Sequence, residues 1–200
     1  MIPDRLVLAT ANPGKRRELR ELVAGWGPVV VAGLDAFAGV ELPDERGGSY
    51  AENAVAKATA AARATGLPAL GDDSGLEVEA LGGAPGLRSS RYADSDAERI
   101  AKLLAALRDV PEARRAARFV CVVAAVFPDG RVATAEGVCH GRIAAVAAGR
   151  AGFGYDPVFV PEGFDRTLAE VGAEAKQGLS HRARAVRSLG ERLQHGPAGV

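Results

Sequence analysis

The central part of the chain contains two strand-like apolar runs, 119–127 and 132–140, joined by Pro128-Asp129-Gly130. Such a turn between two apolar runs is typical of a β-hairpin, whose strands are antiparallel. Further strand-like runs at 5–10, 28–32 and 158–160 are interleaved with helical patterns at 15–23, 49–65, 94–107 and 179–193. The interleaving indicates an α/β fold, and the hairpin predicts a mixed sheet rather than a purely parallel one.

Two hundred residues suit one domain, which we expect to span 1–195, with 196–200 as a frayed tail. The 25 basic and 25 acidic residues balance, so global charge gives no reason to expect nucleic-acid or membrane binding. Cys121 and Cys139 lie in apolar runs, which favours buried thiols in a reducing compartment. No signal-peptide pattern and no bilayer-spanning apolar run is present, so we expect a soluble cytoplasmic protein.

The basic residues comprise 21 arginines and only four lysines. Lys102 belongs to an amphipathic helical pattern. Lys15, Lys57 and Lys176 occur in segments that other residues also mark as candidate parts of a functional site. The Lys ammonium is a compact point charge, and the Arg guanidinium is a planar fork. Lysines retained in an arginine-rich chain favour sites that need an ammonium, and coincidence among only four lysines is the alternative.

The segment Asp72-Asp73-Ser74-Gly75 places two adjacent carboxylates between an apolar run and an alternating one. We interpret it as a strand, a tight turn and a second strand. Because successive strand residues point to opposite faces, one Asp would anchor the turn while the other projects into open space. A projecting carboxylate is suited to binding magnesium or acting as a general base. The alternative is that Asp-Ser-Gly is only turn chemistry.

The segment Thr10-Ala11-Asn12-Pro13-Gly14-Lys15 connects the first strand-like run to a helical pattern. A helix N-terminus presents free N–H groups and a partial positive charge, which together attract anions. Lys15 adds a cation in the first turn, where the helix dipole disfavours it, and a bound anion would explain that placement. The segment is not a P-loop, because the first Gly and the hydroxyl residue after the Lys are missing. A simple connection with an incidental Lys is the alternative.

The sequence Ser49-Tyr50-Ala51-Glu52 is a capping-box pattern that opens an Ala-rich helix, which Gly66 is expected to end. Asn53 and Lys57 are four residues apart on this helix and therefore share one face. That face is either part of a site or simply solvated.

Two further segments carry chemical signatures. In Gly152-Phe153-Gly154-Tyr155-Asp156-Pro157, glycines surround two aromatic residues, so Phe153 could stack on a base and Asp156 could accept a hydrogen bond from a ring nitrogen. The alternative is a buried aromatic turn. Further on, Lys176 precedes Ser180-His181-Arg182, whose donors converge at a helix start and suit a carbonyl oxygen or a phosphate.

Together these segments resemble the inosine triphosphate pyrophosphatase family, which hydrolyses non-standard purine nucleoside triphosphates. The resemblance covers the chain from Leu6 to about Leu193. It rests on Ala9-Thr10-Ala11-Asn12-Pro13-Gly14-Lys15, Glu52-Asn53-Ala54 with Lys57, Asp72-Asp73-Ser74-Gly75-Leu76, Gly82-Gly83-Ala84-Pro85-Gly86, and Gly152-Phe153-Gly154-Tyr155-Asp156-Pro157 followed by Ser180-His181-Arg182.

The resemblance implies a mixed, twisted sheet flanked by helices, two lobes with an active-site cleft, and a homodimer. It implies hydrolysis of ITP, dITP and XTP to the monophosphate and pyrophosphate with Mg²⁺, which cleanses the nucleotide pool. Asp73 is the implied metal ligand and general base, and Lys57 the second catalytic residue. A second carboxylate ligand is implied before the capped helix, and its position matches Asp44, with Glu45 adjacent.

The resemblance also assigns substrate contacts to Thr10, Ala11, Asn12, Pro13, Gly14, Lys15, Ser74, Phe153, Gly154, Tyr155, Asp156, Lys176, His181 and Arg182. Asp72 is expected to shape the turn or to hold a supporting position. Lys15, Lys57 and Lys176 would neutralise the charge of the departing pyrophosphate. Donors from His181 and Arg182 would pair with the 6-keto group of hypoxanthine or xanthine and oppose the 6-amino group of adenine.

Two other functions fit parts of this pattern. An enzyme of similar fold that hydrolyses dTTP or UTP is one, although Phe153 and Ser-His-Arg favour a purine. A nucleotide-sensing module that binds without cleaving is the other, although Asp73 and Lys57 argue against it. Hydrolysis products from ITP, dTTP and ATP distinguish all three.

Overall fold

The computed structural model describes residues 1–195, apart from the side chain of Ala173, and contains one six-stranded sheet of order β2-β1-β3-β4-β5-β6. The strands are β1 Arg5–Ala9, β2 Val30–Gly33, β3 Ala69–Val78, β4 Ala116–Val126, β5 Val132–Ile143 and β6 Phe159–Pro161. β1 runs parallel to β2 and to β3, whereas β5 and β6 are antiparallel. The predicted mixed α/β sheet with flanking helices is confirmed. The predicted tail, 196–200, lies outside the described residues.

Five α-helices accompany the strands within the described chain: α1 Pro13–Val23, α2 Tyr50–Thr65, α3 Asp96–Ala106, α4 Leu168–Leu179 and α5 His181–His195. The caps of α2 agree with the sequence prediction, because the Ser49 side chain accepts a hydrogen bond from Glu52 N and Gly66 ends the helix in the left-handed conformation. None of the helices in residues 1–195 is long and apolar enough to cross a membrane.

The sequence analysis missed α4. Gly172 interrupts this helix with a φ of 85°, so the apolar residues on either side do not follow one continuous helical period. Ser180 lies between α4 and α5, and its N–H donates to Lys176 O.

The chain folds into two compact units, and each unit is built from separate stretches of sequence. The first comprises Met1–Asp73, Cys121–Gly137 and the chain from Arg182 onward. The second comprises Ser74–Val120 and Val138–His181. β3, β4 and β5 each contribute residues to both units.

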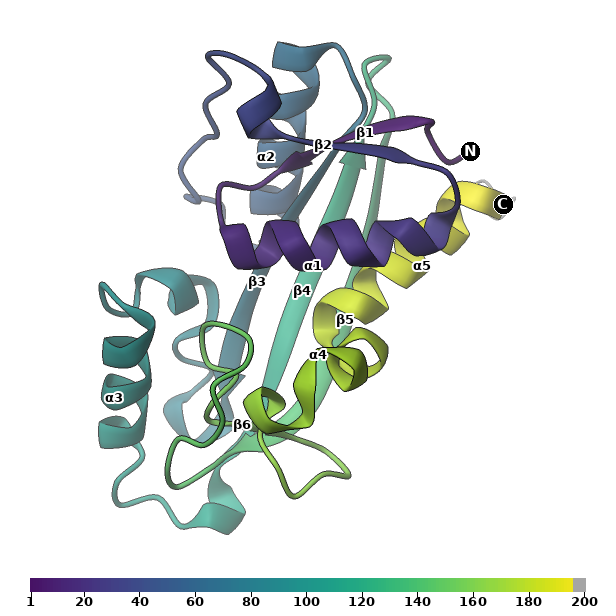
Figure 1. Ribbon diagram of the computed structural model, residues 1–200. Coiled ribbons are helices and arrows are strands. Elements are labelled where there is room, and N and C mark those ends of the chain that lie inside the picture. Colours follow the sequence, from purple (N-terminus) through teal and green to yellow (C-terminus); the bar gives the residue numbers. More distant parts are fainter. Residues whose placement is uncertain (196–200) are drawn as a thin grey trace, which may run out of the picture. The chain divides into compact units, whose positions relative to one another are not determined.

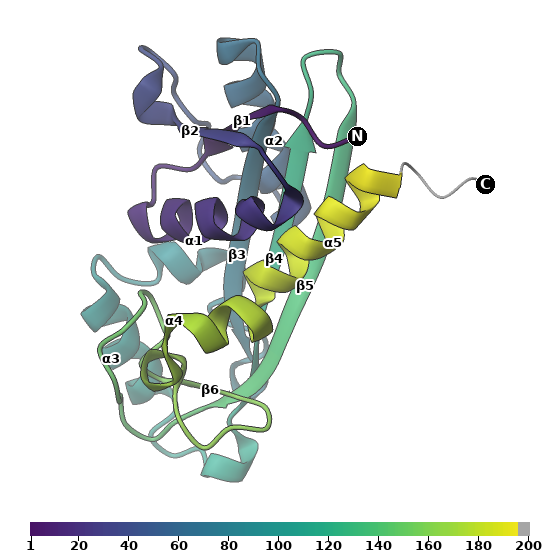
Figure 2. The same cartoon turned by 45° about the vertical axis from the view of Figure 1, so that its right-hand side comes forward.

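The first unit has three layers, set by the alternation of strand side chains. Leu6, Leu8 and Leu70 point to one face, where α1 and α5 pack, and Val7, Ala9 and Ala69 point to the other, where α2 packs. Figure 1 and Figure 2 show α1 and α5 on the side of the strands opposite α2. The period of two along each strand therefore decides which helix any strand residue contacts.

The second unit has a core of its own. Leu76 and Val78 of β3 pack there with Leu103 of α3, with Phe119 of β4 and with Phe159 of β6. The rings of Phe119 and Phe159 lie 4.6 Å apart, centroid to centroid. Tyr155 also belongs to this core, although the sequence analysis placed it among the substrate-binding residues.

The predicted turn at Asp72-Asp73-Ser74-Gly75 is wrong, because these residues lie within the uninterrupted strand β3. β3 is an interior strand, hydrogen-bonded to β1 and β4. The register with β1 runs from Ala69 to Gly71, and β4 borders the other side of β3, so the segment is built into the sheet despite the weak turn preference of Asp-Ser-Gly. The two carboxylates are therefore fixed on opposite faces of the sheet.

Candidate active site

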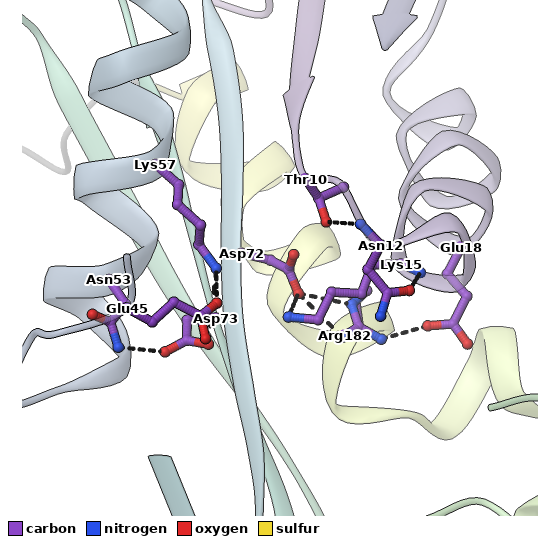
Figure 3. A network of polar contacts seen from close by, with 10 residues as sticks. All are labelled: Thr10, Asn12, Lys15, Glu18, Glu45, Asn53, Lys57, Asp72, Asp73 and Arg182. Atoms are coloured by element: carbon purple, nitrogen blue, oxygen red, sulfur yellow. Dashed lines mark hydrogen bonds and ion pairs between the residues drawn. The ribbon is translucent and has the colours of Figure 1, made fainter. Parts of the chain in front are cut away.

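Asp72 and Asp73 take part in two different polar clusters. Asp72 follows Leu70 in the alternation and faces α1 and α5, whereas Asp73 follows Ala69 and faces α2. Figure 3 shows the two side chains on opposite sides of β3. Both are buried.

The Asp73 cluster consists of Asp73, Asn53, Lys57 and Glu45. Asn53 Nδ2 donates to Asp73 Oδ2 at 2.8 Å, and Lys57 Nζ lies 3.9 Å from Asp73 Oδ1. Lys57 Nζ also donates to Glu45 Oε1 at 2.6 Å (Figure 3). The alternative of a solvated helix face is therefore wrong, because Asn53 and Lys57 are only 3% and 6% exposed.

A glycine in β3 allows α2 to approach the strand closely enough for these contacts. A Cβ on Gly71 would lie 2.4 Å from Ala54 O and 2.9 Å from Ala58 N, both backbone atoms of α2. Real Cβ atoms do not approach backbone this closely. Asn53 and Lys57 lie next to these two residues in the chain, so Gly71 controls how close they come to Asp73.

The loop before α2 brings Glu45, rather than Asp44, to Asp73. Gly47 N donates to Asn53 Oδ1 at 2.8 Å, and Gly48 N donates to Glu52 Oε2 at 2.8 Å, so the loop is bound to the first turn of α2. Asp44, the sequence-based choice for the second metal ligand, has a 70% exposed side chain that pairs with Arg46. The two neighbouring residues have different partners, which spacing along the sequence could not show.

The charges of this cluster influence one another strongly. Burial raises the pKa of Asp73, and the nearby Glu45 raises it further, against the opposing effect of Lys57. Burial would lower the pKa of Lys57, but the carboxylates of Asp72, Glu45 and Asp73 outweigh it, so the pKa is raised. The ammonium therefore stays charged, and Asp73 is a stronger base than an ordinary Asp.

The Asp72 cluster consists of Asp72, Lys15, Arg182 and Glu18. Asp72 Oδ2 lies 3.1 Å from Lys15 Nζ and accepts from Arg182 Nε at 3.2 Å and Nη2 at 3.1 Å (Figure 3). Arg182 Nη1 donates to Glu18 Oε2. Burial would raise the pKa of Asp72, but Lys15, Arg182 and Lys57 outweigh it and hold that pKa well below its usual range. Glu18 was not found from the sequence, although it lies one helical turn after Lys15.

The start of α1 is organised as the sequence predicted, with a strand, a turn and a helix. Asn12 caps the helix, its side chain accepting from Lys15 N at 3.0 Å, and Thr10 Oγ1 accepts from Asn12 N at 3.2 Å. Ala11, Asn12 and Pro13 are exposed, and Gly14 is half-buried. The placement of Lys15 in this first turn is compensated by Asp72 within the protein itself.

In the second unit, Phe153, Asp156 and Lys176 come together. Asp156 Oδ2 accepts from Phe153 N at 2.9 Å and from Lys176 Nζ at 2.6 Å. Lys176 Nζ lies 4.8 Å from the centre of the Phe153 ring. Asp156 is thus engaged by its own unit, whereas the sequence analysis assigned it to a ring nitrogen of the ligand. The Tyr155 hydroxyl donates to Ser89 O at 3.0 Å inside the core.

His181 and Arg182 are adjacent at the start of α5 but have different partners. The His181 ring stacks on Phe119, with centroids 4.7 Å apart and planes at 12°. Arg182 binds Asp72 and Glu18, as described above. The sequence analysis expected the donors of the two side chains to converge on one point. In the structure they have different partners. Ser74 is half-buried in β3, directly after Asp73.

Within residues 1–195, no three His, Cys, Asp or Glu side chains gather closely enough to hold a metal by themselves. The Asp73 cluster offers two carboxylates, Asp73 and Glu45. Mg²⁺ usually binds one or two protein carboxylates and keeps several waters, so this donor set fits Mg²⁺ better than a metal that needs a full protein cage.

Comparisons with known proteins bear on the whole chain. It is 50% identical to the dITP/XTP pyrophosphatase of Symbiobacterium thermophilum over 196 residues. The aligned region covers 96% of each chain. It is 47% identical over 198 residues to the dITP/XTP pyrophosphatase of Thermus thermophilus, covering 96% of this chain and 93% of the relative.

Solved structures agree. A HAM1 protein from Coxiella burnetii superposes with a TM-score of 0.85 at 40% identity, covering 96% of this chain and 99% of that one. A structure named nucleoside-triphosphatase / dITP/XTP pyrophosphatase from Mycobacterium abscessus gives a TM-score of 0.73 at 42% identity, covering 92% and 97%. The model of the Ham1 family matches residues 6–192. Because the family model matches residues 6–192 and these relatives are 40–50% identical over nearly the whole chain, the chain belongs to the Ham1 family.

Proposed function

We propose that this protein hydrolyses ITP, dITP and XTP to the nucleoside monophosphate and pyrophosphate, and so removes deaminated purine nucleotides from the nucleotide pool. The observation that carries the proposal is the buried Asp73, held by Asn53 beside Lys57 and Glu45. The names of the relatives, which are dITP/XTP pyrophosphatases, support the same reaction.

The reaction is a displacement at the α-phosphorus. Water attacks that phosphorus, a new P–O bond forms, and the bond to the oxygen that bridges to the β-phosphorus breaks, so pyrophosphate leaves with the bonding electrons. Asn53 holds Asp73 Oδ2, and we assign Oδ1 as the atom that accepts the proton of the attacking water. The raised pKa of Asp73 suits this task, because a general base works best when its pKa is near the working pH.

We propose Asp73 and Glu45 as the carboxylates that hold Mg²⁺, with Glu45 in place of Asp44. The observation behind this change is that Glu45 reaches the Lys57 ammonium beside Asp73, whereas Asp44 is exposed and paired with Arg46. When bound, Mg²⁺ would supply positive charge to the phosphate oxygens and to the departing pyrophosphate. Lys57 would balance the carboxylate pair from within the protein.

The phosphates require further positive charge, and the start of α1 offers it. The exposed backbone at 11–13 belongs to a helix N-terminus, which attracts anions, and Lys15 lies in the same turn. We therefore keep Thr10, Ala11, Asn12, Pro13, Gly14 and Lys15, together with Ser74, as the phosphate-side contacts of the proposed site. Lys15 is already close to Asp72, so the segment remains ordered before a phosphate arrives.

For the base we propose Phe153 as the stacking surface, with Gly154, Tyr155, Asp156, Lys176 and His181 of the same unit as its surroundings. Arg182 stays a proposed substrate contact. Lys176 is placed by Asp156 and lies over the Phe153 ring, which suits recognition of a keto oxygen next to a stacked purine. A site that donates to the 6-keto group leaves donors unpaired against adenine, which can discriminate by roughly 10⁴-fold.

One assay tests the proposed function. The protein is incubated with Mg²⁺ and, separately, with ITP, XTP, dTTP and ATP, and the released phosphorus species are identified by ³¹P NMR. We expect pyrophosphate from ITP and XTP, and none above background from dTTP or ATP. Pyrophosphate from dTTP alone would favour a pyrimidine enzyme, and binding of ITP without any product would favour a nucleotide sensor.

We also propose a homodimer and a cytoplasmic location. The two cysteines within the described chain are free and buried, which fits a reducing compartment. Sedimentation equilibrium tests the dimer directly. One chain has a mass of 20.6 kDa, so the dimer should sediment with twice that mass. A species that stays monomeric at micromolar concentration would overturn the dimer.

A further inference from the structure

The loop from Gly152 to Asp156 contains two glycines with left-handed backbone, Gly152 at φ 80° and Gly154 at φ 62°. Glycine-rich backbone is conformationally free unless other groups hold it. In the proposed function this loop carries Phe153, the stacking surface for the purine. What holds the loop therefore determines how the ring is presented.

We infer that Asp96, at the start of α3, is a positioning residue that fixes the Phe153 ring for the purine. The inference rests on the proposed function for the role of Phe153. Gly154 N donates to Asp96 Oδ2 at 2.8 Å, across 58 residues of sequence. The peptide N–H directly after Phe153 is thus bound to a carboxylate from another element of the same unit.

Asp96 is itself held firmly. Its second oxygen, Oδ1, accepts from Arg99 Nη1 at 2.6 Å, and Arg99 Nε donates to Ala93 O at 3.0 Å. The helix that carries Asp96 begins with a full capping box formed by Ser95 and Glu98. A carboxylate in the first turn is also stabilised by the helix dipole. The anchor for the loop is therefore an ordered group on a regular element.

The residues on either side of Gly154 are bound by partners that do not belong to α3. The hydrogen bond from Gly154 N is therefore the contact through which Asp96 of α3 acts on the loop. Phe153 N donates to Asp156 Oδ2, within the loop itself. The Tyr155 hydroxyl donates to Ser89 O, and Ser89 Oγ accepts from Leu76 N of β3 at 2.8 Å. With the peptides on both sides of Phe153 bound by carboxylates, the backbone that carries its ring is held before any ligand arrives.

An acidic residue in the first turn of α3 would stabilise that helix without any loop partner, and this is the competing explanation. It predicts that substitution of Asp96 changes stability and leaves substrate binding unchanged. A positioning role predicts a change in the KM for ITP with little change in kcat, because the base lies away from the bond that is cleaved.

The test compares Asp96→Ala, Asp96→Asn and the control Asp94→Ala, which removes an exposed carboxylate two residues away. Loss of a hydrogen bond to a charged group corresponds to about tenfold in affinity, so we expect Asp96→Ala to raise the KM for ITP about tenfold. Asp96→Asn keeps an oxygen that can accept from Gly154 N, so its KM should return close to the wild-type value. Asp94→Ala should match the wild type.

A second set of measurements shows whether Asp96 acts through the loop. In Phe153→Ala protein, Asp96→Ala should cause no further rise in KM, because the ring it positions is already gone. With ¹⁵N-glycine labelling, the Gly154 amide should exchange with solvent faster in Asp96→Ala than in wild-type or Asp96→Asn protein.

The positioning role of Asp96 and the proposed hydrolysis of ITP can fail separately in these experiments. Unchanged Gly154 exchange in Asp96→Ala, or an unchanged KM despite faster exchange, would overturn the positioning role. Additive effects of Asp96→Ala and Phe153→Ala would overturn it too. If wild-type protein releases no pyrophosphate from ITP, the proposed function fails, and the exchange measurement still decides whether Asp96 holds the loop.

Discussion

Asp72 and Asp73 are neighbours with opposite electrostatic surroundings. The cations Lys15, Arg182 and Lys57 lower the pKa of Asp72, whereas burial and the nearby Glu45 raise the pKa of Asp73. A carboxylate that neighbouring cations hold ionised stabilises the fold, while one with a raised pKa is suited to accept a proton. Strand alternation thus gives the two residues separate surroundings.

At Asp73 we predict a loss of activity without a loss of fold. Asp73→Asn keeps the shape and an oxygen for Asn53 but removes the proton acceptor, so kcat with ITP should fall by about 10²–10⁴-fold. The melting temperature should stay the same or rise, because a buried charge beside Glu45 disappears. Steady-state kinetics and thermal unfolding measure the two effects, and a variant that keeps most of its kcat would refute the assignment.

At Asp72 we predict the reverse, a loss of stability. Asp72→Asn leaves the buried Arg182 with Glu18 and deprives Lys15 of its carboxylate, which should cost roughly 3–5 kcal/mol in the free energy of unfolding. Urea unfolding of both proteins measures this difference.

The stability difference at Asp72 should depend on pH in one direction. The folded-state pKa of Asp72 is lowered, so its stabilisation is fully present above the unfolded-state value of about 3.9 and is lost as pH falls through the folded-state value. The free-energy gap between wild type and Asp72→Asn should be constant above about pH 5 and shrink below about pH 4. A gap that widens in acid would contradict the ion-pair explanation.

Glu45 and Asp44 form a matched pair for the metal assignment. Glu45→Gln should raise the Mg²⁺ concentration needed for half-maximal activity by about tenfold or more, since a charged ligand is lost. Asp44→Asn should leave that concentration unchanged, because the Asp44 side chain is exposed and pairs only with Arg46 among the contacts described. Magnesium titrations of ITP hydrolysis compare the two variants. An equal rise in the required Mg²⁺ concentration for both would argue against Glu45 as the second metal ligand.

Among the elements, the close packing of α2 on β3 determines the geometry around Asp73. Gly71→Ala would force a Cβ against backbone atoms of α2, so we expect a loss of about 1–3 kcal/mol in stability and a lower kcat as Asn53 and Lys57 move. Gly25→Ala is the control, because a Cβ there meets nothing within 4 Å. Thermal unfolding and ITP kinetics report both effects, and a Gly71→Ala protein with wild-type kcat would show that this packing does not position the site.

Elements with strong local signals were predicted well, and those without them were not. The hairpin of β4 and β5 and the caps of α2 follow from a few adjacent residues, so sequence patterns detect them. β3 was misjudged because its pairing with β1 and β4 depends on distant segments. α4 was missed because Gly172 breaks its periodicity.

At the scale of the whole molecule, three strands contribute to both compact units. We predict that the protein unfolds as a single cooperative domain, because each of these three strands contributes residues to both units. Calorimetry should then give one transition whose calorimetric enthalpy equals the van't Hoff enthalpy. Two resolved transitions would show that the units unfold independently.

The sequence alone determined the mixed α/β class, the family resemblance and the residue types of the proposed site. These features depend on adjacent residues and short motifs, which can be recognised without the path of the chain. The tertiary structure alone decided which groups meet. Asp72 and Arg182 are 110 residues apart, and Asp96 and Gly154 are 58 apart. It also placed Glu45, and not Asp44, against Lys57, and it divided the aspartates of β3 between two faces. Such pairings depend on the path of the chain and on which strand face each helix covers, and no local pattern encodes either.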